Sequence, residues 1–203
     1  LQYFLPLFDW QRSEAEARAV WVGFLGSPRL YRPLLEVLKP HFLETADHYD
    51  ALGEYGNQYA SLLTFAALDP ADTFATNELA KATRSLPLKG LEESSQALVN
   101  ALDGAGEQRA DYWANRIKPY LSKIWPNTRE NISPSIAERF GRLCIAADEA
   151  FPEALEMLRA WLQPPPHPDF LIRRFYQANL SERFPKPALE FLSRLIGDQS
   201  QWI

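Results

Sequence analysis

Ala154-Leu155-Glu156-Met157-Leu158 and Ala188-Leu189-Glu190-Phe191-Leu192 are almost the same five residues, and they lie 34 positions apart. A Phe-Pro pair precedes each of them, at Phe151-Pro152 and at Phe184-Pro185. Both pentapeptides place apolar residues three and four positions apart, which is the spacing along one face of an α-helix. A helical hairpin of about 34 residues is the unit of several stacked helical repeats. The sequence therefore predicts a repeated helical hairpin here, with chance similarity between amphipathic helices as the alternative.

The predicted hairpin units cover residues 134–163 and 168–197. In the first unit, the second helix is expected to bury five positions, Ala154, Leu155, Leu158, Trp161 and Leu162. The positions 34 residues later are also apolar, namely Ala188, Leu189, Leu192, Leu195 and Ile196. The first helices of the two units, which open at Pro134 and Pro168, match less well at this offset. We do not extend the repeat upstream of residue 134.

Helix start and stop signals recur along the rest of the chain. Ser13 with Glu16 three residues later forms a capping box, and Ser133-Pro134 pairs an N-cap with a proline at the first helical position. Thr76 is expected to cap a short helix, and Pro40 to kink or divide another. No segment alternates apolar and polar residues as a half-buried strand does. We predict an all-α fold, either a HEAT-like or TPR-like array of helical hairpins or an irregular α-solenoid, wound as a right-handed superhelix.

Length and composition fit one globular domain. The chain has 203 residues, of which 46% are hydrophobic and 23% are charged, and no apolar run reaches the length of about 18 residues that a membrane span needs. We predict a single all-helical domain over residues 1–203, with a sub-boundary near residues 126–133. Because the sequence begins at Leu1, we expect a fragment of a longer chain. The single cysteine, Cys144, fits a reducing, cytoplasmic setting.

Charge is distributed unevenly along the chain. Residues 1–80 hold 5 Lys/Arg and 11 Asp/Glu, whereas residues 81–203 hold 16 and 15, which together give the net charge of −5. Sequence-independent binding of nucleic acid depends on a basic surface, because its affinity comes from releasing counterions from phosphates. The balance therefore argues against nonspecific nucleic-acid binding, most strongly for the N-terminal part.

Few residues offer catalytic or metal chemistry. His41, Glu44 and His48 share one face of a predicted helix and could present a metal-binding face, but the favoured interpretation is an acidic, solvated helix surface. Cys144 lies among apolar residues and is expected in the core, and His167 lies in a proline-rich linker. The sequence contains no Gly-rich phosphate loop and no nucleophile elbow. We expect no catalytic residue, no cofactor and no bound metal.

One predicted helix carries a candidate binding surface. Its inward face is expected to hold Ala110, Trp113, Ile117, Leu121 and Ile124. Beside that face lies a row of cations with one aromatic residue, followed by a further arginine; the candidate residues are Arg109, Tyr112, Arg116, Lys123 and Arg129. Exposed arginine and tyrosine are typical of interaction hot spots. The alternative is that the arginine stems only shield the edge of the core.

Several phrases of the sequence resemble a known bacterial domain. They are Ser27-Pro28-Arg29-Leu30-Tyr31-Arg32-Pro33-Leu34-Leu35, Leu68-Asp69-Pro70-Ala71-Asp72-Thr73-Phe74, Gly104-Ala105-Gly106-Glu107-Gln108-Arg109, Tyr112-Trp113, Ile124-Trp125-Pro126 and Leu143-Cys144-Ile145-Ala146-Ala147. They resemble an uncharacterised C-terminal helical domain of large bacterial proteins whose N-terminal part is sirtuin-like. The resemblance implies a context of anti-phage defence, in which the sirtuin-like module consumes nicotinamide dinucleotide, and it lends no catalytic residue to this chain.

These observations predict a non-catalytic interaction or regulatory domain that serves sensing or assembly. Its expected partner is another protein, the upstream domain of its own parent chain, or a second copy in a homo-oligomer; no membrane partner is expected. The alternative is a helical repeat that binds nucleic acid through its arginines and one lysine, Arg109, Arg116, Lys123, Arg129, Arg173 and Arg174. A metal-dependent enzyme using His41 and His48 is a more distant alternative.

Overall fold

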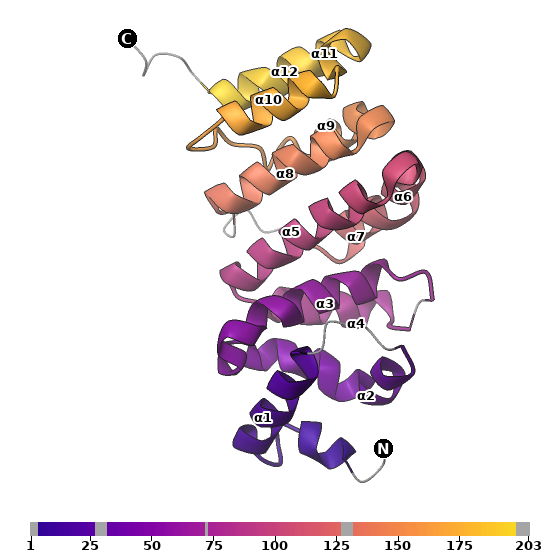
Figure 1. The fold of residues 1–203 in the computed structure, drawn as a ribbon, viewed down its shortest axis with the longest axis vertical. Helices are drawn as coiled ribbons and strands as arrows, with labels where there is room; N and C mark the ends of the chain where they lie inside the picture. Colours follow the sequence, from indigo (N-terminus) through magenta and orange to yellow (C-terminus); the bar gives the residue numbers. More distant parts are fainter. Residues whose placement is uncertain (1–3, 27–31, 72, 127–131, 198–203) are drawn as a thin grey trace. The chain divides into compact units, whose positions relative to one another are not determined.

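The structure is a computed structural model that describes residues 4–26, 32–71, 73–126 and 132–197. Every regular element within these ranges is a helix, and none of these residues lies in a strand (Figure 1). The all-α prediction is confirmed. None of the described helices combines the length and the apolar character that crossing a membrane requires.

Contacts between residues divide the chain into two compact units. Unit 1 contains Leu1–Ser94 and Tyr120–Pro126, and unit 2 contains Ser95–Pro119 and Asn127–Ile203. Helices α5 and α7 each contribute residues to both units. The prediction of a single domain with a sub-boundary near residues 126–133 stays a prediction.

Unit 1 is a helical bundle with an aromatic core. Trp21, Phe42 and Tyr59 are fully buried, and the Tyr59 hydroxyl donates a 2.7 Å hydrogen bond to the Phe42 carbonyl oxygen. The elements of the unit are η1 (Leu5–Phe8), α1 (Glu14–Leu25), α2 (Arg32–Glu44), η2 (Thr45–Tyr55), α3 (Gly56–Leu68), α4 (Thr76–Ser85), the first part of α5 (Leu88–Gly104) and the last part of α7 (Lys118–Lys123).

Of the helix signals in the sequence, two caps are confirmed, one predicted cap is wrong, and the division of a helix that was one of two outcomes expected at Pro40 does not occur. The Ser13 and Ser133 side chains each accept a backbone N–H of the first turn, as predicted. Thr76 is not a cap, because α4 has its N-cap at Ala75, whose backbone N–H donates to the Glu78 carboxylate. Pro40 does not divide its helix: α2 continues through it to Glu44, where a 3-10 segment begins.

Unit 2 contains two helical hairpins that contact each other. The first hairpin is α8 and α9, and the second runs from α10 through α11 to α12. Helix α8 packs against α9 and α10, and α12 packs against α9 and α11 (Figure 1). The first helices of the two hairpins, α8 and α10, are therefore in contact, and so are the second helices, α9 and α12. The elements of the unit are the last part of α5, η3 (Gly106–Gln108), α6 (Arg109–Tyr112), the π-helical turn η4 (Trp113–Ile117), the start of α7, α8 (Pro134–Ala146), η6 (Asp148–Ala150), α9 (Phe151–Leu158), α10 (Asp169–Gln177), α11 (Leu180–Arg183) and α12 (Pro185–Ile196).

Four phenylalanines join the two hairpins. The Phe151 ring lies 5.8 Å from Phe175, 6.1 Å from Phe184 and 5.6 Å from Phe191, measured between ring centroids. Phe175 and Phe191 stack at 5.4 Å. Aromatic pairs at such distances add to the free energy gained from burying their area. The repeated Phe-Pro pairs of the sequence therefore supply Phe151 and Phe184 to one shared cluster.

The inward-facing residues agree with the repeat in α9 and depart from it in α12. Ala154, Leu155, Leu158 and Leu162 are buried, and Trp161 is half-buried. In α12, Ala188 and Leu195 are buried as predicted and Leu192 is half-buried. The prediction is wrong at Leu189 and Ile196, which are 72% and 38% exposed. Helix α12 packs on α9 and α11, and its fully buried Phe191 faces Phe151 and Phe175, so Leu189 and Ile196 lie toward solvent.

The first helices of the two hairpins match at a different offset from the second helices. Ile136 and Leu171 are both fully buried and lie 35 residues apart, as do Phe140 and Phe175. Helices α8 and α10 also begin 35 residues apart, at Pro134 and Asp169. An offset of 34 therefore compares residues on different faces of these two helices, which explains their poor sequence match.

Candidate functional site

The predicted binding residues are distributed over several elements. Arg109 and Tyr112 are the first and last residues of α6, and Arg116 lies in η4. All three are half-buried and belong to unit 2, whereas the exposed Lys123 belongs to unit 1. Arg129 lies outside the described residues.

A π-helical turn changes the phase of this helical segment. The Lys118 backbone N–H bonds to the Trp113 carbonyl oxygen, five residues back, and Pro119 follows at once. A π turn holds more residues than an α turn, so the faces before and after it no longer align. Trp113, Ile117, Leu121 and Ile124 are buried as predicted. Ala110 is exposed, and its placement in the core is wrong.

Arg109 and Arg174 meet at the same acidic residue, Asp103 near the end of α5. A guanidinium nitrogen of Arg174 pairs with the Asp103 carboxylate at 3.2 Å. Arg109 donates to the Asp103 backbone carbonyl at 3.5 Å, the long limit of a hydrogen bond. The Nε of Arg109 is shielded from solvent and has no hydrogen-bond partner. The structure thus brings together two of the arginines named in the sequence, although they lie 65 positions apart.

Two arginines from neighbouring helices also share one exposed aromatic ring. The guanidinium carbon of Arg142 on α8 lies 5.8 Å from the centroid of the Phe170 ring, and that of Arg174 on α10 lies 5.9 Å from it. Both separations are within the range of cation–π attraction. Phe170 is 51% exposed, so the ring and its two cations form part of the surface of unit 2. We call Arg142, Phe170 and Arg174 the arginine–phenylalanine surface.

Arg142 is the less completely paired of these two cations. One terminal nitrogen donates to the Gln96 side chain at 3.2 Å, while its Nε is shielded from solvent without a partner. Burial, and then the nearby charge of Arg174, lower the pKa of Arg142. Within the described ranges no carboxylate forms an ion pair with Arg142, whereas Arg174 has Asp103. An added anion at this surface would therefore find an incompletely compensated cation.

Only one of the three residues of the arginine–phenylalanine surface, Arg174, is among the candidate residues that the sequence indicates. Phe170 lies four residues before Arg174, a spacing that places two side chains on the same helix face. That spacing is the sequence signal from which Phe170 could have been predicted as a neighbour of Arg174. Arg142 lies beside Phe170 and Arg174 only because α8 packs on α10, and no local sequence pattern predicts that contact.

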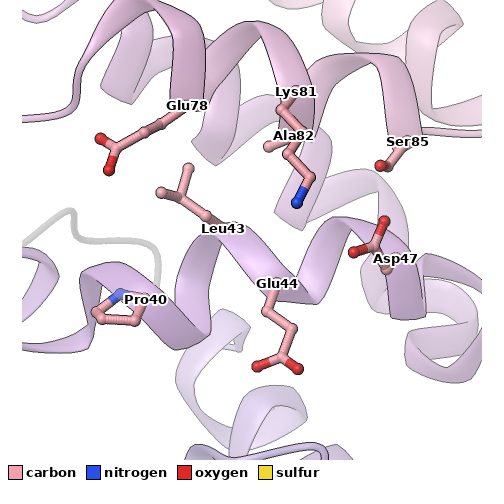
Figure 2. A pocket seen from close by; sticks show the side chains of 8 residues that line it. All are labelled: Pro40, Leu43, Glu44, Asp47, Glu78, Lys81, Ala82 and Ser85. Carbon is pink, nitrogen blue, oxygen red and sulfur yellow. The ribbon is translucent and has the colours of Figure 1, made fainter.

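Unit 1 contains an acidic cleft of about 400 Å³ (Figure 2). Helix α4 forms one side of it, and the end of α2 together with the start of η2 forms the other. In Figure 2 the side chains of Asp47, Lys81 and Ser85 face one another across it, and Glu44 points away from α4. Glu78 is paired with Lys39 at 2.8 Å, and the hydrogen bonds from Lys39 and Ala75 lower the pKa of this carboxyl. The cleft's acidic character agrees with the negative charge of residues 1–80.

The predicted grouping of His41, Glu44 and His48 is not the one that the structure forms. The His48 ring stacks on Trp10 at 4.5 Å and 6° between planes. Asp9 takes its place: one ligand atom from each of Asp9, His41 and Glu44 lies within 4.8 Å of the other two. No sequence signal indicates Asp9, because it comes from a separate segment after η1.

Cys144 is fully buried in α8, as the sequence predicted. Burial raises the pKa of its thiol far above the ordinary value, because the charged thiolate is poorly stabilised away from water. The thiol is therefore not activated as a nucleophile at neutral pH.

No protein-family model, curated protein or solved structure matches this chain. Its function must therefore be inferred from its own residues.

Proposed function

We propose that this chain is a non-catalytic helical interaction domain that binds an acidic segment of a protein partner at the arginine–phenylalanine surface. The observation that carries the proposal is the exposed Phe170 ring, which two arginines from neighbouring helices approach to within 6 Å. Arginine and large aromatic side chains are the residues that most often dominate binding energy at interfaces.

The chemistry of the surface favours carboxylates as ligands. A guanidinium group presents several N–H donors that match the two oxygens of a carboxylate, and such charge-assisted bonds are stronger than neutral ones. The Nε of Arg142 has no hydrogen-bond partner among the described residues, and Arg174 pairs with one carboxylate, that of Asp103. Phe170 adds apolar area between the charges. An acidic peptide segment with an apolar side chain fits this combination.

The architecture that we propose for the domain is an array of stacked helical hairpins, forming a right-handed α-solenoid. The pairing of α8 with α10 and of α9 with α12 supports it, because stacked repeats place equivalent helices in contact. The shared phenylalanine cluster supports it as well, since it buries apolar area that one hairpin alone would expose.

The biological setting is also a proposal. The resemblance to a domain that follows sirtuin-like modules supports a role in sensing or assembly during bacterial anti-phage defence, with the catalysis performed elsewhere in the parent chain. The buried, free Cys144 is consistent with the reducing cytoplasm that we propose as its location. The complete coding sequence tests this setting, because it either does or does not encode a sirtuin-like module upstream.

The binding proposal is tested by titrating the chain with a short fluorescent oligoglutamate peptide that contains one leucine. The decisive variant is Arg142→Gln with Arg174→Gln. Its matched control is Arg116→Gln with Arg173→Gln, which removes the same charge from residues outside the surface. We expect the first pair to weaken binding by at least about tenfold, because two charge-assisted contacts are lost, and the control pair to change it less than about threefold by screening alone.

Each outcome of this titration supports or overturns the proposal. Equal weakening by the two double variants would show nonspecific attraction by net charge and would overturn it. A single-stranded oligonucleotide that binds more tightly than the peptide would favour the nucleic-acid alternative instead. Light scattering in the absence of peptide completes the test by comparing the unaltered chain with the Arg142 and Arg174 double variant. If the unaltered chain self-associates and the double variant does not, the partner is a second copy of this chain, and the proposal of an acidic external partner fails.

A further inference from the structure

We propose that Asp9, His41 and Glu44 form a binding site for a divalent transition-metal cation in unit 1. His41 and Glu44 lie one turn apart near the end of α2, and Asp9 directly follows η1. One ligand atom from each residue lies within 4.8 Å of the other two. Imidazole nitrogen and carboxylate oxygen are the ligands that Zn²⁺ and Mn²⁺ accept in proteins.

The imidazole of His41 is available for a ligand. Its Nδ1 atom is shielded from solvent and has no hydrogen-bond partner. Although the ring lies close to two carboxylates, it forms no ion pair with either of them in the part of the chain that the structure describes. A buried polar atom without a partner costs free energy, and a cation bound through this nitrogen would remove that cost.

The two carboxylates have no cationic partner among the described residues. Gln11 holds one oxygen of each: its backbone N–H donates to Asp9 Oδ1 at 2.9 Å, and its side-chain amide donates to Glu44 Oε1 at 2.8 Å. These bonds orient both carboxylates and leave the second oxygen of each for an ion. Hydrogen bonds of this kind commonly support metal ligands.

The geometry requires a small closure on binding. Bonds of about 2.1 Å from the ion allow two ligand atoms to be at most about 4.2 Å apart. The observed limit of 4.8 Å exceeds this by a distance that side-chain rotation covers. The neighbouring segment is well fixed, because the Trp10 indole N–H donates to the Thr45 hydroxyl at 2.8 Å and its ring stacks on His48.

The test is calorimetric titration of the whole chain with Zn²⁺. We expect one ion per chain, with affinity lowered at least about tenfold in Asp9→Asn, in His41→Ala and in Glu44→Gln. The matched controls are His48→Phe, which keeps an aromatic ring on Trp10, and Asp47→Asn, which removes an exposed carboxylate close to Glu44. Both controls are expected to bind within about twofold of the unaltered chain. Binding that survives His41→Ala, or that His48→Phe reduces equally, would overturn the proposal.

A second measurement needs no substitution and decides the matter if a variant fails to fold. Nuclear magnetic resonance of the imidazole nitrogens follows all three histidines of the unaltered chain as Zn²⁺ is added. We expect a ring nitrogen of His41 to shift with one equivalent, while those of His48 and His167 stay in place. Absence of a shift at His41, or equal shifts at all three, would refute the site.

Discussion

Leu155 and Leu189 occupy equivalent places in the sequence repeat, which predicts that both are buried. The structure buries only Leu155, and alanine substitution at each position distinguishes the repeat's prediction from the structure. Leu155 is 2% exposed and Leu189 is 72% exposed. Leu155→Ala removes the equivalent of three buried carbons, about 2.4 kcal/mol at about 0.8 kcal/mol each, and leaves a cavity. We expect it to lower the free energy of unfolding by about 2–5 kcal/mol. Leu189→Ala should cost about 0.5 kcal/mol or less.

Urea unfolding followed by far-ultraviolet circular dichroism measures both losses. Because the two units can unfold separately, tryptophan fluorescence is recorded on the same samples, and the comparison uses the transition that Leu155→Ala shifts. Equal losses at the two positions would refute the packing described for α12 and restore the face that the repeat predicts. A loss at Leu155 below about 1 kcal/mol would refute the buried position of α9 in the same way.

Three further substitutions or probes test local features of the structure. Ser133→Ala should cost about 0.5–2 kcal/mol because it removes an N-cap, whereas Thr76→Ala, its control, should cost less than about 0.5 kcal/mol, both by urea unfolding. Lys118 lowers the pKa of Glu153, so their pairing stabilises the fold above the ordinary pKa of Glu153 and is lost as pH falls through its lowered value. The melting temperature of Glu153→Gln should therefore fall less on acidification than that of the unaltered chain, and parallel curves would contradict the pairing. Cys144 should react with a thiol reagent only after denaturant is added, and rapid labelling of the folded chain would contradict its burial.

The sequence predicted the features of the fold that local patterns encode. Ser13 and Ser133 cap helices because each side chain accepts the backbone N–H of the residue three positions later, a wholly local interaction. Leu155 was placed correctly because α9 has neighbours that cover a broad face. The same pattern failed at Leu189, since burial there depends on which helices surround α12 and not on the residue itself.

The candidate sites were only partly predictable for the same physical reason. Ala110 was misplaced because a π turn shifts the helix phase, and periodicity analysis assumes a constant turn. Arg109 and Arg174 were named separately, but their common neighbour Asp103 follows from tertiary packing. Arg142 likewise reaches the site through the contact of α8 with α10, which the sequence does not reveal.

The measurement that most directly tests the proposed interaction surface is nuclear magnetic resonance of the arginine Nε–H groups during titration with the acidic peptide. Arg142 and Arg174 lie beside Phe170, whereas Arg173 is exposed and outside the surface. We predict that the signals of Arg142 and Arg174 shift together and saturate at one peptide per chain, while the Arg173 signal stays where it is. Shifts of equal size at all three arginines, or no shift at Arg142 and Arg174, would contradict the proposal that this surface binds an acidic partner.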